Sequence, residues 1–213
     1  MASDLDLRER HELSDLLDEL GPDQPTLCEG WTTADLAAHL VVRERDPRAG
    51  PGILLGGRFE GYTDTLMARQ LEKYDYAGTV ERVRTGPPWG PLRIAPLRHA
   101  MNLVEFFTHH EDVRRPNGLD PRTDRPDLDD ELWAYVRRMG PMMVRRAKLD
   151  GVRLSLRRPD GERVDAGKGD EVVTMTGAPG ELVLALYGRD GAEVTYDGEE
   201  QAVATVLAGA FGF

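Results

Sequence analysis

The apolar positions in the first two thirds of the chain recur at helical spacing. Residues 4–20 carry one such stripe, which ends at Gly21-Pro22. A second helix begins where Thr32 can cap and Asp35 can return the capping-box hydrogen bond. The Gly- and Pro-rich residues 46–61 then predict a long connection. Further helices are expected at about 60–74, 77–85, 97–116 and 127–148.

The pattern changes after Gly151. Residues 152–167 alternate apolar and polar positions around a Pro-Asp-Gly turn, which predicts a β-hairpin. Two more strands and two short helices are expected beyond it, with the strands at 171–177 and 192–198 and the helices at 178–188 and 199–212. We therefore predict an α+β chain, with a helical domain over residues 1–149 and a small α/β domain over residues 150–213.

Composition narrows the class of protein. The 213 residues carry a net charge of −11, from 38 acidic against 27 basic side chains, which argues against nucleic-acid or anionic-membrane partners. The single cysteine excludes an internal disulfide and fits a reducing cytoplasm. The charged N-terminus resembles no secretory signal, and no apolar run approaches the roughly 20 residues that span a bilayer. We expect a soluble cytoplasmic protein, either a monomer or a homodimer.

Side chains that could bind a metal or take part in catalysis are most concentrated in residues 102–116, NLVEFFTHHEDVRRP. Glu105, His109 and Asp112 follow at i, i+4 and i+7, so they share one face of the expected helix. A glutamate and a histidine so placed can bind one divalent ion from successive turns. The same spacing also suits an exposed Glu–His pair on an ordinary charged helix, and both interpretations stay open on spacing alone. Asp112 is expected either to bind the ion or to orient a ligand histidine from behind.

A third ligand has to come from another helix, and His39 is the leading candidate. Leu36 and Leu40 share its side of the expected helix and should point inward. Helical bundles build metal sites from inward side chains on facing helices. Two histidines, one glutamate and an open position are the composition of a catalytic rather than a structural zinc site. A histidine on an apolar face is also often a hydrogen-bonded core residue, and this alternative stays open for His39.

Two further residues near these motifs have simpler interpretations. His110 lies about 100° round the helix from His109 and cannot share its direction, so it is expected at the surface or in a supporting position. Cys28 is expected to be a small buried apolar side chain, with a thiol close to the site as the alternative.

Two stretches together resemble a known family. LCEGWTTADLAAHLVVRERDP, residues 27–47, resembles the second-helix region of the DinB-like, mycothiol-dependent maleylpyruvate isomerase superfamily, where members read C-x-G-W-T-x-x-D-L-x-x-H-L. NLVEFFTHHEDVRRP resembles the later E-x-x-x-H-x-x-D segment of that family. GAPGELVLALYGRDG is similar to a small α/β domain that many actinobacterial members append and that resembles sterol-carrier-type folds. The best match is an uncharacterised actinobacterial metal-binding subgroup.

This resemblance implies a DinB-like four-helix bundle followed by a sterol-carrier-like domain. It implies that His39, Glu105 and His109 bind a divalent metal, usually zinc, and that a low-molecular-weight thiol such as mycothiol serves as cofactor. By the same resemblance a C-terminal arginine contacts an anionic group, and Arg189 is the candidate here, with an exposed arginine at a helix end as the alternative.

The chain departs from the family directly after the metal histidine. Many members read Gly-Trp-Asp there, whereas this chain has His110-Glu111-Asp112. Two polar residues in place of a small and an aromatic one change the surroundings of the site. The substrate of the isomerase therefore does not transfer to this chain.

The resulting hypothesis is a metal-dependent thiol transferase or isomerase, which adds a low-molecular-weight thiol to a small electrophilic substrate. An alternative of another class is a protein that binds a metal or a small apolar ligand without turnover. A third possibility is a metal-dependent hydrolase, in which a bound water is the nucleophile. The first requires a thiol and the third does not, which separates them by assay.

Overall fold

The computed structural model describes residues 4–46, 60–122 and 124–212. It divides into two compact units, Met1–Pro121 and Arg122–Phe213, each of which is described by itself. The long connection expected at 46–61 lies, over residues 47–59, outside the described residues.

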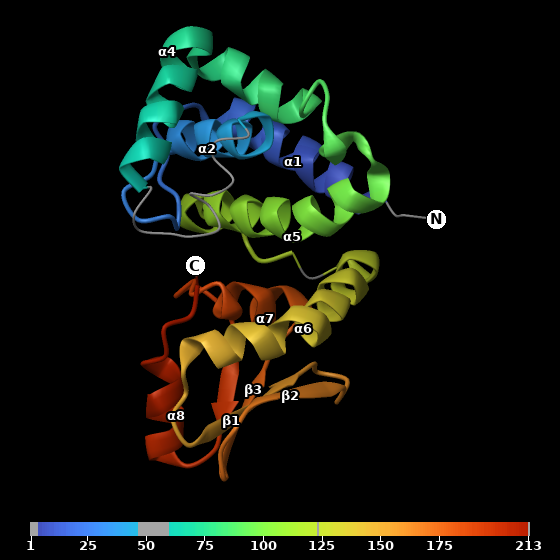
Figure 1. The fold of residues 1–213 in the computed structure, drawn as a ribbon, viewed down its shortest axis with the longest axis vertical. Helices are drawn as coiled ribbons and strands as arrows, with labels where there is room; N and C mark the ends of the chain where they lie inside the picture. The colour runs from blue at the N-terminus through green and yellow to red at the C-terminus, as the bar shows by residue number, and fades with distance from the viewer. Residues whose placement is uncertain (1–3, 47–59, 123, 213) are drawn as a thin grey trace. The chain divides into compact units, whose positions relative to one another are not determined.

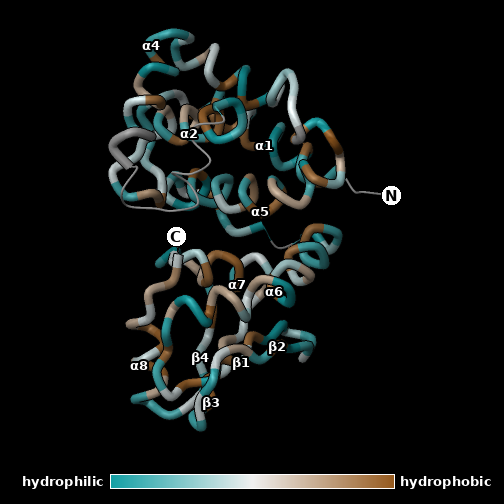
Figure 2. The backbone as a smooth tube through the Cα atoms, in the orientation of Figure 1, coloured by the Kyte–Doolittle hydropathy of each residue, from teal (hydrophilic) through white to brown (hydrophobic). Residues whose placement is uncertain are grey.

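The N-terminal unit is helical (Figure 1). Its elements are α1 (Leu5–Leu20), α2 (Thr33–Arg45), α4 (Glu60–Thr85), the 3₁₀ turn η1 (Pro91–Arg93), α5 (Ala95–Arg114) and the 3₁₀ turn η2 (Arg115–Asn117). Helix α1 packs on α5 and α4, and α2 packs on α4. Figure 2 shows apolar residues, in brown, recurring along these helices, and their buried members form a large core cluster and a smaller one between α2 and α4. Among the fully buried members of the large cluster are Leu13, Leu17, Leu36, Leu40, Val80 and Phe106.

Local signals place the ends of these helices. The capping box that opens α2 is present in full: Thr32 Oγ1 accepts from the Asp35 amide, and the Asp35 carboxylate accepts from the Thr32 amide at 2.9 Å. The two helices expected at 60–74 and 77–85 form α4, which is interrupted by non-helical geometry at Asp75. There the Asp75 carboxylate accepts a hydrogen bond from the amide of Gly78, so it caps the second segment as an N-cap residue does.

The C-terminal unit contains a four-stranded sheet with strand order β2-β1-β3-β4. Its elements are α6 (Pro126–Ala147), β1 (Val152–Arg157), β2 (Arg163–Gly167), β3 (Glu171–Thr176), α7 (Pro179–Leu186), β4 (Thr195–Asp197) and α8 (Glu200–Leu207). The pairs β1–β2 and β3–β4 are antiparallel, whereas β1 and β3 are parallel. The expected hairpin, the two further strands and both short helices are therefore present (Figure 1).

Helix α6 packs within the C-terminal unit. It contacts α7, β2 and β1, and the two units part at Pro121 instead of at the predicted boundary between residues 149 and 150. The apolar stripe of α6, which includes Leu128, Leu132 and Val136, covers the sheet and α7. An amphipathic helix shows that one face is buried, but its pattern does not say against which core.

The chain thus combines helices with one small sheet, which confirms the predicted α+β class. Among the residues that the structure describes, no helix has the length and apolar character needed to cross a bilayer.

Candidate metal centre

Three predicted ligand side chains meet between α2 and α5. The Nε2 atom of His39 lies 3.5 Å from Oε1 of Glu105, and Nε2 of His109 lies 3.4 Å from the same oxygen. The two imidazole rings meet edge to face, with centroids 5.2 Å apart. One possible ligand atom from each residue lies within 4.8 Å of the other two. The spacing expected on one helix and the inward histidine expected on another therefore meet at one point.

Helix geometry explains why these atoms converge. Glu105 and His109 are one turn apart on α5 and therefore share a face of that helix. Phe106, which follows Glu105, is fully buried in the core. His39 follows the buried Leu36 on α2 by three positions and is partly buried itself. The indole ring of Trp31 packs against the His39 imidazole at 5.0 Å between centroids, which limits the orientations of that ring.

A cation borders the cluster. Arg43 lies one turn after His39 on α2, and its Nε donates to Oε1 of Glu105 at 3.0 Å. Its two terminal nitrogens donate to the Asn102 side chain at 2.9 Å and to the Met101 carbonyl at 2.8 Å. The guanidinium is therefore fixed by α5 at three points, and it partly neutralises the Glu105 carboxylate.

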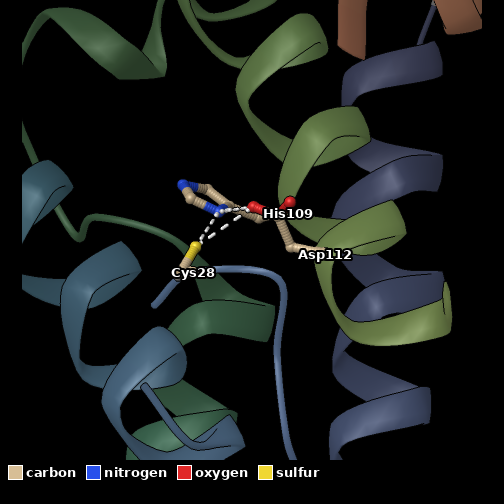
Figure 3. A group of neighbouring side chains, drawn as sticks. All are labelled: Cys28, His109 and Asp112. Carbon is tan, nitrogen blue, oxygen red and sulfur yellow. Dashed lines mark hydrogen bonds and ion pairs between the residues drawn. The ribbon is translucent and has the colours of Figure 1, made fainter. Parts of the chain in front are cut away.

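The second ring nitrogen of His109 is held by a carboxylate (Figure 3). Nδ1 of His109 lies 3.0 Å from Oδ2 of Asp112, which is fully buried and also accepts from the Cys28 thiol at 3.2 Å. With Nδ1 protonated toward Asp112, the Nε2 atom is the one presented to Glu105. A carboxylate behind a histidine fixes the tautomer and orientation of a metal-binding ring in this manner.

The loop that supplies Cys28 is tied to α5 by its backbone. The amide of Leu27 donates to the Asp112 carbonyl at 2.9 Å, and the Trp31 amide donates to the Cys28 carbonyl in a tight turn. Gly30 has φ of +76° in that turn, a conformation that favours glycine. The glycine of the C-x-G-W motif therefore has a structural reason, since it closes the turn between the thiol and Trp31.

Electrostatics of the cluster follow from burial opposed by close partners. Burial alone would lower the pKa of His109, but hydrogen bonds with Asp112, Cys28 and Glu105 outweigh it and hold the pKa well above its ordinary value. For His39 burial dominates, and the pKa is lowered. Burial alone would raise the pKa of Glu105, yet Arg43 and the two histidines keep it well below its ordinary value. In the absence of metal the site therefore contains an ionised Glu105 beside a protonated His109.

The donor set fits a divalent metal of the zinc type. Two imidazole nitrogens and one carboxylate oxygen are the protein ligands of many catalytic zinc sites. Ligand atoms about 2.1 Å from a tetrahedral ion lie about 3.4 Å from one another. The 3.4 and 3.5 Å separations from Glu105 Oε1 agree with that value.

Other candidate residues have different surroundings from those expected. His110 is not at the surface: its side chain is buried, and Nδ1 lies 3.2 Å from Oε2 of Glu9 on α1. Glu9 gives the buried imidazole a polar partner, and the hydrophobic periodicity of the sequence cannot reveal a partner on a distant segment. Arg189 follows α7 in the C-terminal unit, where Nη1 donates to the Tyr187 carbonyl at 3.0 Å, and its role in binding an anion stays a prediction.

The sequence alone did not reveal Arg43 as part of this cluster. Its signal was present, because residue 43 lies four positions after His39 and therefore on the same helical face. Cys28, considered either as a core residue or as a thiol near the site, lies within 3.2 Å of Asp112 and 4.0 Å of His109.

The fold is similar to that of a known enzyme. The structure is similar to a crystal structure of the mycothiol-dependent maleylpyruvate isomerase (TM-score 0.57, 20% identity) and to one of its histidine-to-alanine mutant (TM-score 0.59, 17% identity). Each match covers 92% of this chain and 90% of the other. No protein-family model matches the chain, and no curated protein matches it by sequence. The resemblance identified from the sequence is thus confirmed at the level of the fold.

Proposed function

From this shared fold and the donor cluster, we propose that the protein is a metal-dependent enzyme that uses a low-molecular-weight thiol, of the mycothiol kind. The substrate is a small electrophilic molecule, and the reaction is S-transfer or, after elimination of the thiol, isomerisation. His39, Glu105 and His109 hold a divalent metal, with zinc as the expected ion. The observation that carries the proposal is the convergence of both histidine Nε2 atoms on one oxygen of Glu105.

Two side chains next to the proposed ligands, Asp112 and Arg43, have different roles. Asp112 fixes His109 with Nδ1 protonated and Nε2 directed to the metal. Arg43 offsets the charge of Glu105 and adds a positive charge beside the cluster, which would favour an anionic ligand there. The metal, when bound, supplies Lewis acidity that stabilises a thiolate at neutral pH. Because the nucleophile is the external thiol, no side chain of the protein has to act as one.

Metal analysis of the purified full-length protein tests the ligand set. We expect about one zinc per chain, and strong loss of metal in His39→Ala, Glu105→Ala and His109→Ala. His11→Ala is the matched control, because His11 is exposed on α1 and belongs to no ligand cluster of the described residues. Stoichiometric metal in all three ligand variants would refute the site.

The thiol requirement is tested separately with the metal-loaded protein. Consumption of small electrophiles such as maleyl compounds is measured with and without mycothiol or a simpler thiol. We expect turnover only when thiol is present. Turnover of esters or amides without thiol would instead support the hydrolase, and metal binding without any turnover would support the non-catalytic alternative.

A further inference from the structure

A cavity of about 350 Å³ lies between α2 and α4 in the N-terminal unit. Its polar lining consists of Arg45 at the end of α2, Asp46 directly after it, and Arg69, Gln70, Lys73, Tyr74 and Arg82 from α4. None of the proposed metal ligands lines it. It is therefore a second candidate site, distinct from the metal centre.

The charge of this lining is unusual for the chain. Four cations face one carboxylate, although the protein as a whole carries a net charge of −11. Over residues 4–46 and 60–122, no carboxylate forms an ion pair with Arg69, Lys73 or Arg82. Positive side chains gathered without counter-charges create a potential that attracts anions.

Two buried nitrogen atoms in the lining have no hydrogen-bond partner among the residues that the structure describes. They are the Nε atoms of Arg45 and Arg82. Nη2 of Arg45 donates to the Arg82 carbonyl at 3.0 Å, to Thr85 Oγ1 at 3.1 Å and to the Gly86 carbonyl, whereas its Nε has no acceptor in the described part of the chain. The Arg82 guanidinium stacks on the Tyr74 ring, 4.0 Å from its centroid. Buried donors without acceptors oppose folding, so two of them beside one cavity indicate an acceptor that the described residues do not supply, and a bound anion would provide it.

The ionisation of neighbouring groups agrees with a positive local potential. Burial lowers the pKa of Arg45, and the charge of Arg82 lowers it further. A hydrogen bond with Lys73 lowers the pKa of the Tyr74 hydroxyl, and Arg82 acts in the same direction.

We propose that this cavity binds a small polyanion through its phosphate or carboxylate oxygens. The planar guanidinium groups of Arg45 and Arg82 present donors that match either group, and Lys73 adds a point charge. The volume falls within the range of small-molecule sites, so the ligand is a metabolite-sized anion. Phosphate and carboxylate ligands share this chemistry, and the test has to separate them.

Calorimetric titration of the full-length protein provides the test, with pyrophosphate and citrate as probes and sodium chloride keeping the ionic strength constant. We expect saturable binding of at least one probe at about one site per chain. Arg82→Gln and Lys73→Gln should each weaken that binding about tenfold, the effect of losing one charge-assisted contact. Arg138→Gln is the matched control, since Arg138 is exposed on α6 in the other unit.

A stability measurement guards against a merely structural role of Arg82. Without added anions, Arg82→Gln should melt at the same temperature as the wild type or higher, because it removes a half-buried cation whose buried Nε has no acceptor among the described residues. Lys73 is exposed, so Lys73→Gln tests the site even when the Arg82 variant fails to fold.

The two probes then identify the ligand class. Preference for pyrophosphate assigns the site to phosphate-bearing ligands, and preference for citrate assigns it to carboxylates. Lack of saturable binding by both probes would overturn the proposal, as would an equal loss of affinity in Arg138→Gln.

Discussion

Replacement of Asp112 by asparagine gives the sharpest test of how the metal centre is organised. The Asp112 side chain is fully buried, and its Oδ2 atom accepts from both His109 Nδ1 and the Cys28 thiol. Asparagine retains the shape and one acceptor oxygen but removes the negative charge. Loss of a carboxylate behind a metal-binding histidine lowers metal affinity about 10- to 100-fold.

The expected loss of zinc affinity depends on which hydrogen-bond acceptors each variant at position 112 retains. We expect Asp112→Asn to lose about tenfold in zinc affinity, or about 1.4 kcal/mol, because the neutral amide can still accept both hydrogen bonds. Asp112→Ala should lose about 100-fold, because His109 Nδ1 and the Cys28 thiol are then left without an acceptor. The ranking of the two variants by zinc affinity is as informative as either measured affinity.

The loss in Asp112→Asn should depend on pH. Asp112 also raises the pKa of His109 in the metal-free protein, so near pH 6 the wild type must release a proton to bind zinc. The variant has less to release, and this offsets part of its weaker binding. The difference between the two proteins should therefore be smaller near pH 6 than near pH 8.

Competition with a zinc-binding dye measures these affinities at each pH. Glu111→Gln is the matched control, since Glu111 is the preceding buried carboxylate and contacts Arg115 instead, at 3.0 Å. Zinc affinity of Asp112→Asn within twofold of wild type at pH 8 would refute the reasoning. An equal loss in Glu111→Gln would do so as well.

Three further predictions concern the stability of the protein. In the folded metal-free protein the pKa of His109 is raised, so protonation of His109 stabilises the fold. This contribution to the free energy of unfolding is fully present below about pH 6.5 and is lost as pH rises through the folded pKa. Urea unfolding in the presence of EDTA measures it. Burial raises the pKa of Tyr76 to about 12, so stability should fall between about pH 10 and 12 in the wild type. This component should be missing in Tyr76→Phe, which at neutral pH loses about 1 kcal/mol with the hydrogen bond from Tyr76 Oη to the Leu17 carbonyl. Gly169→Ala should lower the free energy of unfolding in urea by about 3 kcal/mol, because the new Cβ would lie 2.1 Å from a backbone oxygen. The control Gly161→Ala meets no atom within 4 Å and should lower it by about 1 kcal/mol, because its φ is positive.

The secondary structure was largely predictable because its signals are local. The capping box at Thr32 and the turn residues around the β-hairpin act within a few positions, and the structure contains both elements. The partner of α6 was not predictable from its own pattern. Its apolar stripe would suit either a helical bundle or a sheet, and only the tertiary contacts decide between them.

The candidate site shows the same division between local and distant information. The spacing of Glu105 and His109 is local, and their ligand atoms lie close together as expected. The burial of His110 depends on Glu9, a partner 101 positions away in the chain. Likewise, the position of Arg43 against Glu105 depends on how two helices dock, which hydrophobic periodicity does not specify.

The positions of the three proposed metal ligands along the chain have a consequence for biosynthesis. His39 lies on α2, while Glu105 and His109 lie on α5, and α4 separates the two helices in the chain. A growing polypeptide therefore has no complete ligand set until α5 has left the ribosome and docked. All three ligands nevertheless belong to the N-terminal unit, and domains tend to fold as units in the order of their synthesis. We expect zinc to be acquired co-translationally, before the ribosome has finished the strands of the C-terminal sheet.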